Sequence, residues 1–195
     1  MRSGLEHLPR RPVNIFLRPG EVHFGDRNTR ISTLLGSCVS IVMWHPLRLI
    51  GGMSHILLPE RSRNKPRELD GRYADDAICL LLRQALNAGT RPGEYIVKVF
   101  GGGNMFPGHK PKLSQIRHDY GLKPLAGGPR SQVCEHCGLV NCSVGCRNIG
   151  VVRQLLLQHG LTLVAEDIGG VGHRMVIFDI ASGETWVRQS SINQL

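Results

Sequence analysis

The pattern of apolar and polar positions predicts that strands make up most of this chain. Seven apolar stretches rich in β-branched and aromatic residues are bounded by glycine, proline and polar turn residues, as is typical of strands. These stretches are VNIFLRPGEVHF, RISTLLGSCVSIVMW and LIGGMSHILL within residues 13–58, then EYIVKVFGGGNMF, LTLVAEDIGG, HRMVIFDI and ETWVRQ. Ser182 and Gly183 provide a hairpin turn between the last two.

Two further segments have the apolar spacing of three and four residues that is typical of amphipathic helices. They are YADDAICLLLRQALNAG, where Gly89 ends the pattern, and RNIGVVRQLLLQHG, where Gly160 ends it. Residues 1–12 carry prolines among charges, so we expect a flexible arm there. Because strands dominate, the pattern predicts an α+β or mixed α/β fold, with residues 13–195 forming a single domain.

The composition changes between about residues 107 and 145, where glycine, proline, lysine and cysteine replace the periodic pattern. We expect an insertion or long loop here. Four of the six cysteines cluster at its end in the spacing C-x2-C-x4-C-x3-C, namely Cys134, Cys137, Cys142 and Cys146. Four thiolates could hold a structural zinc ion, and an iron–sulfur cluster is a further alternative. The second C-x2-C pair of a zinc knuckle is absent, so unliganded cysteines remain an equal interpretation.

Composition and charge narrow the class of protein. Of the 195 residues, 41% are hydrophobic and 20% charged, which indicates a soluble globular chain. The start of the chain lacks the apolar region of a signal peptide, and the run LLGSCVSIVMW is too short to span a bilayer, so we expect a cytoplasmic location with reduced cysteines. The net charge of +9 favours an acidic partner, but aromatic residues do not alternate with the basic ones, so we expect no nucleic acid.

Cys38 is the first candidate for chemistry. It follows Gly36 and Ser37 in the middle of the most apolar stretch, where a packing cysteine would need no glycine beside it. A tight turn can expose the sulfur and aim backbone N–H groups at one point, as an oxyanion hole requires. The alternative interpretation is a buried core cysteine, because free cysteine is among the most buried residue types.

His55 is the candidate base for this cysteine. It lies in the apolar run LIGGMSHILLP directly after a glycine pair, and the two runs could form adjacent strands that bring Cys38 and His55 together. A third polar group should orient the histidine. Residues two, four or six apart share one face of a strand, which favours Ser32, and Thr33 is the alternative if the turn shifts the parity.

The stretches LLGSCVSIVMW, GGMSHILLP, RYADDAI, KVFGGGNMF, GCRNIGVV and AEDIGG, followed by the final strand pair, occur in this order between about residues 19 and 187. In combination they resemble the CheD family, the chemoreceptor glutamine deamidases of bacterial chemotaxis. The resemblance implies an α+β sandwich of two mixed β-sheets flanked by helices, similar to the catalytic domain of cytotoxic necrotizing factors. The cysteine-bearing segment interrupts the resemblance and is expected as a loop insertion.

The resemblance also implies an activity and its residues. The enzyme would be a protein-glutamine glutaminase that hydrolyses glutamine side chains of methyl-accepting chemotaxis proteins to glutamate. The family's nucleophile falls on Cys38, its histidine on His55 and its hydroxyl-bearing position on Ser32, where threonine is expected in some relatives. No cofactor is needed for catalysis, glutamate methyl esters are possible further substrates, and a chemotaxis signalling phosphatase is a possible partner.

Two alternatives come from other functional classes. A basic chain with a zinc-bearing loop could be a nucleic-acid-binding module in which Cys38 is merely buried. The chain could also be a non-catalytic chemotaxis adaptor. Neither alternative requires a reactive thiol at Cys38, and this separates both from the deamidase.

Overall fold

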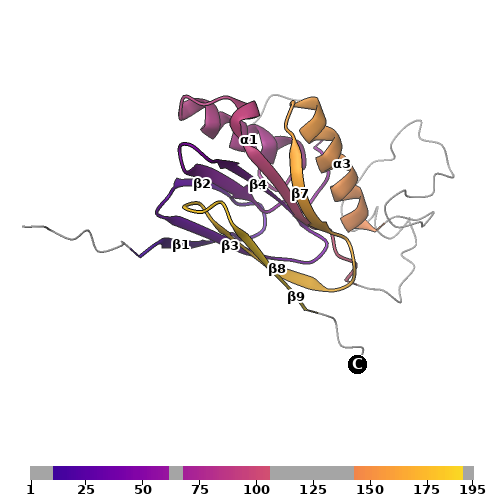
Figure 1. Cartoon of the computed structure of the whole chain (residues 1–195). Helices are drawn as coiled ribbons and strands as arrows, with labels where there is room; N and C mark the ends of the chain where they lie inside the picture. The colour runs from indigo at the N-terminus through magenta and orange to yellow at the C-terminus, as the bar shows by residue number, and fades with distance from the viewer. Residues whose placement is uncertain (1–10, 62–67, 106–142, 191–195) are drawn as a thin grey trace, which may run out of the picture.

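A computed structural model of the chain describes residues 11–61, 68–105 and 143–190, and its elements form three layers (Figure 1). The four-stranded sheet forms one outer layer, the five-stranded sheet the middle layer, and the two long helices the other outer layer. The elements are β1 (Val13–Phe16), β2 (Val22–Asp26), β3 (Thr29–Leu35), β4 (Val39–His45), β5 (Ile50–Ser54), α1 (Ala74–Asn87), the 3-10 helix η1 (Pro92–Glu94), β6 (Ile96–Gly101), α3 (Val144–Gln158), β7 (Leu163–Ile168), β8 (His173–Asp179) and β9 (Thr185–Ser190).

Both sheets are mixed, which confirms the predicted α+β sandwich. The first sheet has the order β1-β3-β8-β9, and only its β1–β3 pair is parallel. The second has the order β2-β5-β4-β6-β7, and only its β6–β7 pair is parallel. In the part of the chain that the structure describes, α1 and α3 both cover the second sheet, so the helices flank the sandwich on one side.

Strand β4 lies at the centre of the molecule and explains the most apolar stretch of the sequence. Val39, Ile41 and Met43 pack against the helices, whereas Val42 packs against the opposite sheet together with Met53 of β5. All five side chains have no exposed surface. A strand that is covered on both faces has a continuous apolar run instead of the alternation of a half-exposed strand.

The second helix begins earlier than the apolar spacing predicts. It starts at Val144, three residues before the predicted start, and the Ser143 hydroxyl caps it by accepting a hydrogen bond from the Cys146 N–H at 3.3 Å. Gly145 in this first turn interrupts the apolar spacing, so the pattern did not predict the turn as helical. Helix α3 therefore includes the last two residues of the predicted insertion, which was placed at about residues 107–145, and residues 106–142 lie outside the described part of the chain. No helix in the described part is long and apolar enough to cross a membrane.

Candidate active site

Cys38 lies on the bend that carries the chain from one sheet to the other. Strand β3 ends at Leu35, a bend follows at Gly36 and Ser37, and β4 begins directly after Cys38. The cysteine is half-buried and packs against the apolar cluster between the two sheets. The turn thus places a thiol at the end of the sandwich, with one side against the core.

The glycines of residues 101–103 support this bend from behind. Gly102 N–H donates to the Cys38 carbonyl at 2.7 Å, and Gly103 N–H donates to the Gly36 carbonyl at 2.8 Å. A Cβ at Gly101 would collide with the Cys38 carbonyl, and its φ of 110° also favours glycine. These glycines allow close approach of backbone to backbone at the cysteine turn.

A second glycine segment, residues 169–172, holds the first one in place. Gly169 N–H donates to the Gly101 carbonyl at 2.8 Å, and Asn104 N–H donates to the Gly170 carbonyl at 2.8 Å. Arg174, which is 1% exposed, donates from its guanidinium to the Asp167 carboxylate and to the Gly169 carbonyl. Three successive sets of hydrogen bonds therefore fix the backbone around the cysteine turn: those from residues 101–103, those between residues 101–104 and 169–170, and those from Arg174.

His55 follows β5, which pairs with β4, so the predicted adjacency of the two apolar runs is confirmed. The pair Val39 and Ile56 continues the antiparallel register, with N–H to carbonyl distances of 3.0 and 2.8 Å in the two directions. In this register Cys38 and His55 are diagonal neighbours on one face of the sheet, the face toward the opposite sheet. No hydrogen bond joins their side chains among the described contacts.

The hydroxyl group beside His55 belongs to Thr33, so the preference for Ser32 was wrong. Thr33 Oγ1 lies 2.7 Å from His55 Nδ1, whereas Ser32 points to the other face of β3 and donates to the Ile15 carbonyl at 3.3 Å. The bend after β3 moves the chain into the other sheet. Counting six residues back from Cys38 along one strand therefore does not give the shared face.

The hydrogen bonds of Thr33 favour one tautomer of His55. Thr33 has one hydroxyl hydrogen, and it donates this hydrogen to the Leu17 carbonyl at 2.8 Å. With that hydrogen engaged, its oxygen accepts the second bond from His55 Nδ1–H in the tautomer protonated at Nδ1. The neutral ring then carries its lone pair on Nε2, the nitrogen that a general base uses toward a thiol.

Burial shifts the pKa of both Cys38 and His55 toward the uncharged form. Burial raises the pKa of the Cys38 thiol above its ordinary value. Burial also lowers the pKa of His55, against the smaller opposing effects of the Leu17 carbonyl and the Glu21 carboxylate. Near neutral pH both shifts favour the uncharged forms, a thiol and an imidazole.

The backbone of His55 is held by the segment between β1 and β2. His55 N–H donates to the Glu21 carbonyl at 2.9 Å, and the His55 carbonyl accepts from Gly20 N–H at 2.8 Å. Gly20 has a φ of 90°, and a Cβ there would meet the side chain of Arg72 at 2.6 Å. The histidine is thus fixed on both sides, by the end of β5 and by this segment.

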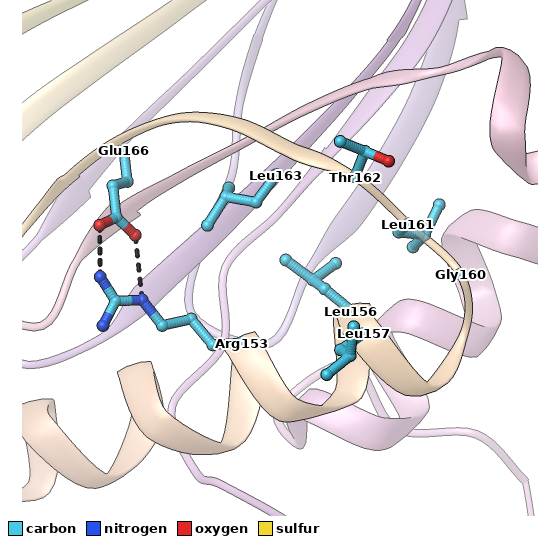
Figure 2. A pocket seen from close by; sticks show the side chains of 8 residues that line it. All are labelled: Arg153, Leu156, Leu157, Gly160, Leu161, Thr162, Leu163 and Glu166. Carbon is cyan, nitrogen blue, oxygen red and sulfur yellow. Dashed lines mark hydrogen bonds and ion pairs between the residues drawn. The ribbon is translucent and has the colours of Figure 1, made fainter.

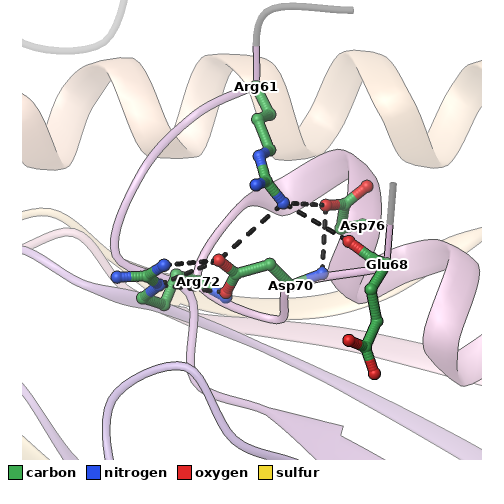
Figure 3. Close-up of polar contacts among 5 residues, drawn as sticks. All are labelled: Arg61, Glu68, Asp70, Arg72 and Asp76. Carbon is green, nitrogen blue, oxygen red and sulfur yellow. Dashed lines mark hydrogen bonds and ion pairs between the residues drawn. The ribbon is translucent and has the colours of Figure 1, made fainter. Parts of the chain in front are cut away.

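Arg72 belongs to a network of charged side chains near the segment that follows His55 (Figure 3). It pairs with Asp70 at 2.6 Å, while Arg61 lies 3.5 Å from the carboxylate of Asp76. The hydrogen bond from Arg72 holds the pKa of Asp70 below its usual range. Because the Arg72 carbonyl accepts from Leu57 N–H at 2.9 Å, this network anchors the chain two residues after His55.

Asn148 of α3 also contacts the site, and the sequence analysis did not identify it. Its side chain is fully buried, and its Nδ2 donates to the Ser37 carbonyl at 3.2 Å and to the Leu57 carbonyl at 2.9 Å. Its Oδ1 has no partner in the described part of the chain. The available signal was a polar residue in the apolar stripe of the helix, four residues before Val152.

A surface pocket lies elsewhere, between the C-terminal half of α3 and the start of β7 (Figure 2). Its volume is about 490 Å³, and an ion pair between Arg153 and Glu166 closes one end. None of Cys38, His55 and Thr33 lines it. The candidate site, at the end of the sandwich, is separate from this pocket.

The predicted cysteine cluster falls mostly outside the described residues. Cys134, Cys137 and Cys142 lie in the segment of residues 106–142. Cys146 is 8% exposed within the first turn of α3. The described residues contain no group of three or more side chains suited to a metal ion, and structural zinc stays a prediction.

Comparison with known proteins identifies the family. The family model described as CheD chemotactic sensory transduction matches residues 57–189. A protein of Pseudomonas savastanoi pv. phaseolicola named "Probable chemoreceptor glutamine deamidase CheD" is 46% identical, over 94% of this chain and 88% of its own length. A protein of Dechloromonas aromatica with the same name, numbered 3, is 44% identical, over 89% and 85%.

Among solved structures, the Bacillus licheniformis hypothetical protein YfiH is 14% identical with a TM-score of 0.43, over 75% of this chain and 49% of its own. A score this low supports no argument, and the likeness to cytotoxic necrotizing factors stays a prediction. The sequence relatives are sufficient to assign the family, because their similarity to this chain extends over about nine-tenths of its length. The chain belongs to the CheD family.

Proposed function

We propose that this chain hydrolyses glutamine side chains of chemoreceptors to glutamate, with Cys38 as nucleophile, His55 as general base and Thr33 as the group that orients the histidine. The observation that carries the proposal is the bond between Thr33 Oγ1 and His55 Nδ1, on the face that also bears the half-buried thiol. The relatives named chemoreceptor glutamine deamidases supply the substrate class.

The first half of the reaction forms a thioester. His55 Nε2 takes the proton of the Cys38 thiol while the sulfur attacks the carboxamide carbon of the glutamine. The oxyanion of the tetrahedral intermediate accepts hydrogen bonds from backbone N–H groups of the turn at Gly36, Ser37 and Cys38. The imidazolium then protonates the leaving nitrogen, the C–N bond breaks, and ammonia departs.

The second half restores the enzyme. His55 Nε2 takes a proton from a water molecule as its oxygen attacks the thioester carbon. The C–S bond breaks, the imidazolium returns the proton to the sulfur of Cys38, and glutamate leaves. This acyl transfer requires no cofactor, and the same steps would release methanol from a glutamate methyl ester.

Thr33 contributes by fixing one tautomer and one ring orientation. Because its hydrogen is engaged by the Leu17 carbonyl, it can only accept from His55 Nδ1–H. The ring is therefore held with Nε2 free for the thiol, as the third member of other Cys-His sites does. The positive net charge of the chain suits a substrate with acidic surroundings.

The test is incubation of the purified chain with chemoreceptor cytoplasmic domains, followed by peptide mass spectrometry of glutamine positions. Wild type should convert specific glutamines to glutamate, and Cys38→Ala and His55→Ala should each abolish conversion while their circular dichroism is unchanged. Cys79→Ala is the matched control, because this cysteine lies on α1 in the helix layer, and it should retain full activity. Conversion by folded Cys38→Ala protein would refute the mechanism. Salt-sensitive nucleic-acid binding, or receptor binding without conversion, would instead favour the two non-catalytic alternatives.

A further inference from the structure

We infer that Asn148 is a positioning residue that fixes the spacing between the two strand ends carrying Cys38 and His55. The inference rests on the proposed function for its catalytic consequence. Its structural basis is separate: one buried side chain of a helix donates to both strand ends at once. Helix α3 therefore contacts the ends of β4 and β5 directly beside the proposed site.

The position of Asn148 coincides with the end of the β4–β5 ladder. The last direct pair between these strands is Val39 with Ile56. One residue further, the N–H of Leu57 turns away to the Arg72 carbonyl at 2.9 Å. At this point the Asn148 amide bridges the Ser37 and Leu57 carbonyls and takes the place of the missing ladder bonds.

The two bridged carbonyls belong to the residues that set the site. Ser37 directly precedes Cys38, and Leu57 comes two residues after His55. Carbonyl oxygens only accept hydrogen bonds, so the group facing them must be the side-chain NH₂, with one hydrogen for each. No other uncharged side chain of this length offers two donors from a single nitrogen while fitting a fully buried site.

The cost of this arrangement supports a positioning role. Asn148 Oδ1 is buried without a partner in the described part of the chain, and such an acceptor destabilises the fold. The surrounding stripe of α3 is apolar, with Ile149 and Val152 both fully buried. An apolar side chain would pack here without that cost but would release both carbonyls.

Loss of the bridge should affect turnover more than substrate binding. If the strand ends separate, the distance between Cys38 Sγ and His55 Nε2 grows, while surfaces that bind the receptor keep their shape. A misplacement of about 1 Å in a catalytic pair can reduce turnover about 100-fold. For Asn148→Ala we expect a fall in kcat of about 10- to 100-fold, with KM changed less than about twofold.

The experiment compares Asn148→Ala with Val152→Ala, a cavity-forming control one turn away on the same helix face. Both variants should lose thermal stability, but only Asn148→Ala should lose kcat. The rate of Cys38 alkylation by iodoacetamide is then measured against pH. In Asn148→Ala the profile should move toward that of His55→Ala, and in Val152→Ala it should match wild type.

Each outcome decides the inference. Wild-type kcat and alkylation in folded Asn148→Ala overturn it, as does an equal loss of kcat in Val152→Ala. If Asn148→Ala does not fold, Asn148→Ser replaces it: one hydroxyl hydrogen can serve only one carbonyl, so a reduced kcat supports the inference and wild-type values overturn it. An inactive wild type would refute the proposed function, whereas the alkylation profiles would still decide the role of Asn148.

Discussion

Replacing Thr33 by valine removes the hydroxyl beside His55 and keeps the shape of the side chain. Thr33 is fully buried, so neither of its two partners can turn to water. His55 Nδ1–H and the Leu17 carbonyl are both left without their partner, and an unpaired buried polar group costs about 1–3 kcal/mol. Because two such groups are left unpaired, we expect Thr33→Val to lower the free energy of unfolding by about 2–6 kcal/mol.

The effect on turnover follows from the same bond. Without an acceptor at Nδ1 the ring can adopt the other tautomer, which places a hydrogen on Nε2 and blocks it as a base. If loss of the correct tautomer raises the activation free energy by about 1.4–2.7 kcal/mol, kcat falls about 10- to 100-fold. Steady-state deamidation with a receptor fragment and chemical denaturation of the free enzyme measure the two quantities.

Two variants serve as controls for Thr33→Val. Thr33→Ser keeps the hydroxyl and should retain most of the turnover. Ser32→Ala removes only a half-buried bond of 3.3 Å on the outer face and should change stability by about 0.5–1 kcal/mol, with kcat unchanged. Full activity in Thr33→Val together with loss of activity in Ser32→Ala would show that the assignment of the orienting residue is incorrect.

Two further predictions concern pH and backbone. Because burial lowers the pKa of His55, activity should persist below its ordinary value of 6.5 and decline as pH falls through the lower pKa of the folded state. The same shift makes this contribution to stability complete above about pH 6.5 and lost as pH falls through the folded pKa, so denaturation of His55→Gln should show less acid sensitivity. Gly101→Ala should destabilise the chain by more than about 2 kcal/mol, because its φ is positive and its Cβ would meet the Cys38 carbonyl. Gly150→Ala, with open space around it on α3, should instead stabilise by about 0.5–1 kcal/mol, as thermal melts can test.

The sequence allowed prediction of most elements and of the adjacency of the two apolar runs that contain Cys38 and His55, for a clear physical reason. Cys38 directly precedes β4 and His55 directly follows β5, and strands joined by such a short turn usually pair in one sheet. The choice between Ser32 and Thr33 depended on a bend between two sheets, where the alternation of a single strand no longer applies.

Asn148 was missed for a different reason. Its partners are backbone carbonyls about 100 residues away in the sequence, and a local pattern carries no information about such contacts. The early start of α3 was missed because Gly145 and the cap at Ser143 lie outside the apolar repeat.

The pairing of β3 with β8 has a consequence for how the protein becomes active during synthesis. All three proposed site residues are synthesised by position 55, yet Thr33 lies opposite Val176 in a ladder that requires β8. Pairing between segments so distant in the chain is a slow, late step of folding. A nascent chain would therefore contain the nucleophile and the base long before their side chains are held in the folded arrangement. The thiol would become reactive only when the C-terminal hairpin of β8 and β9 completes the first sheet.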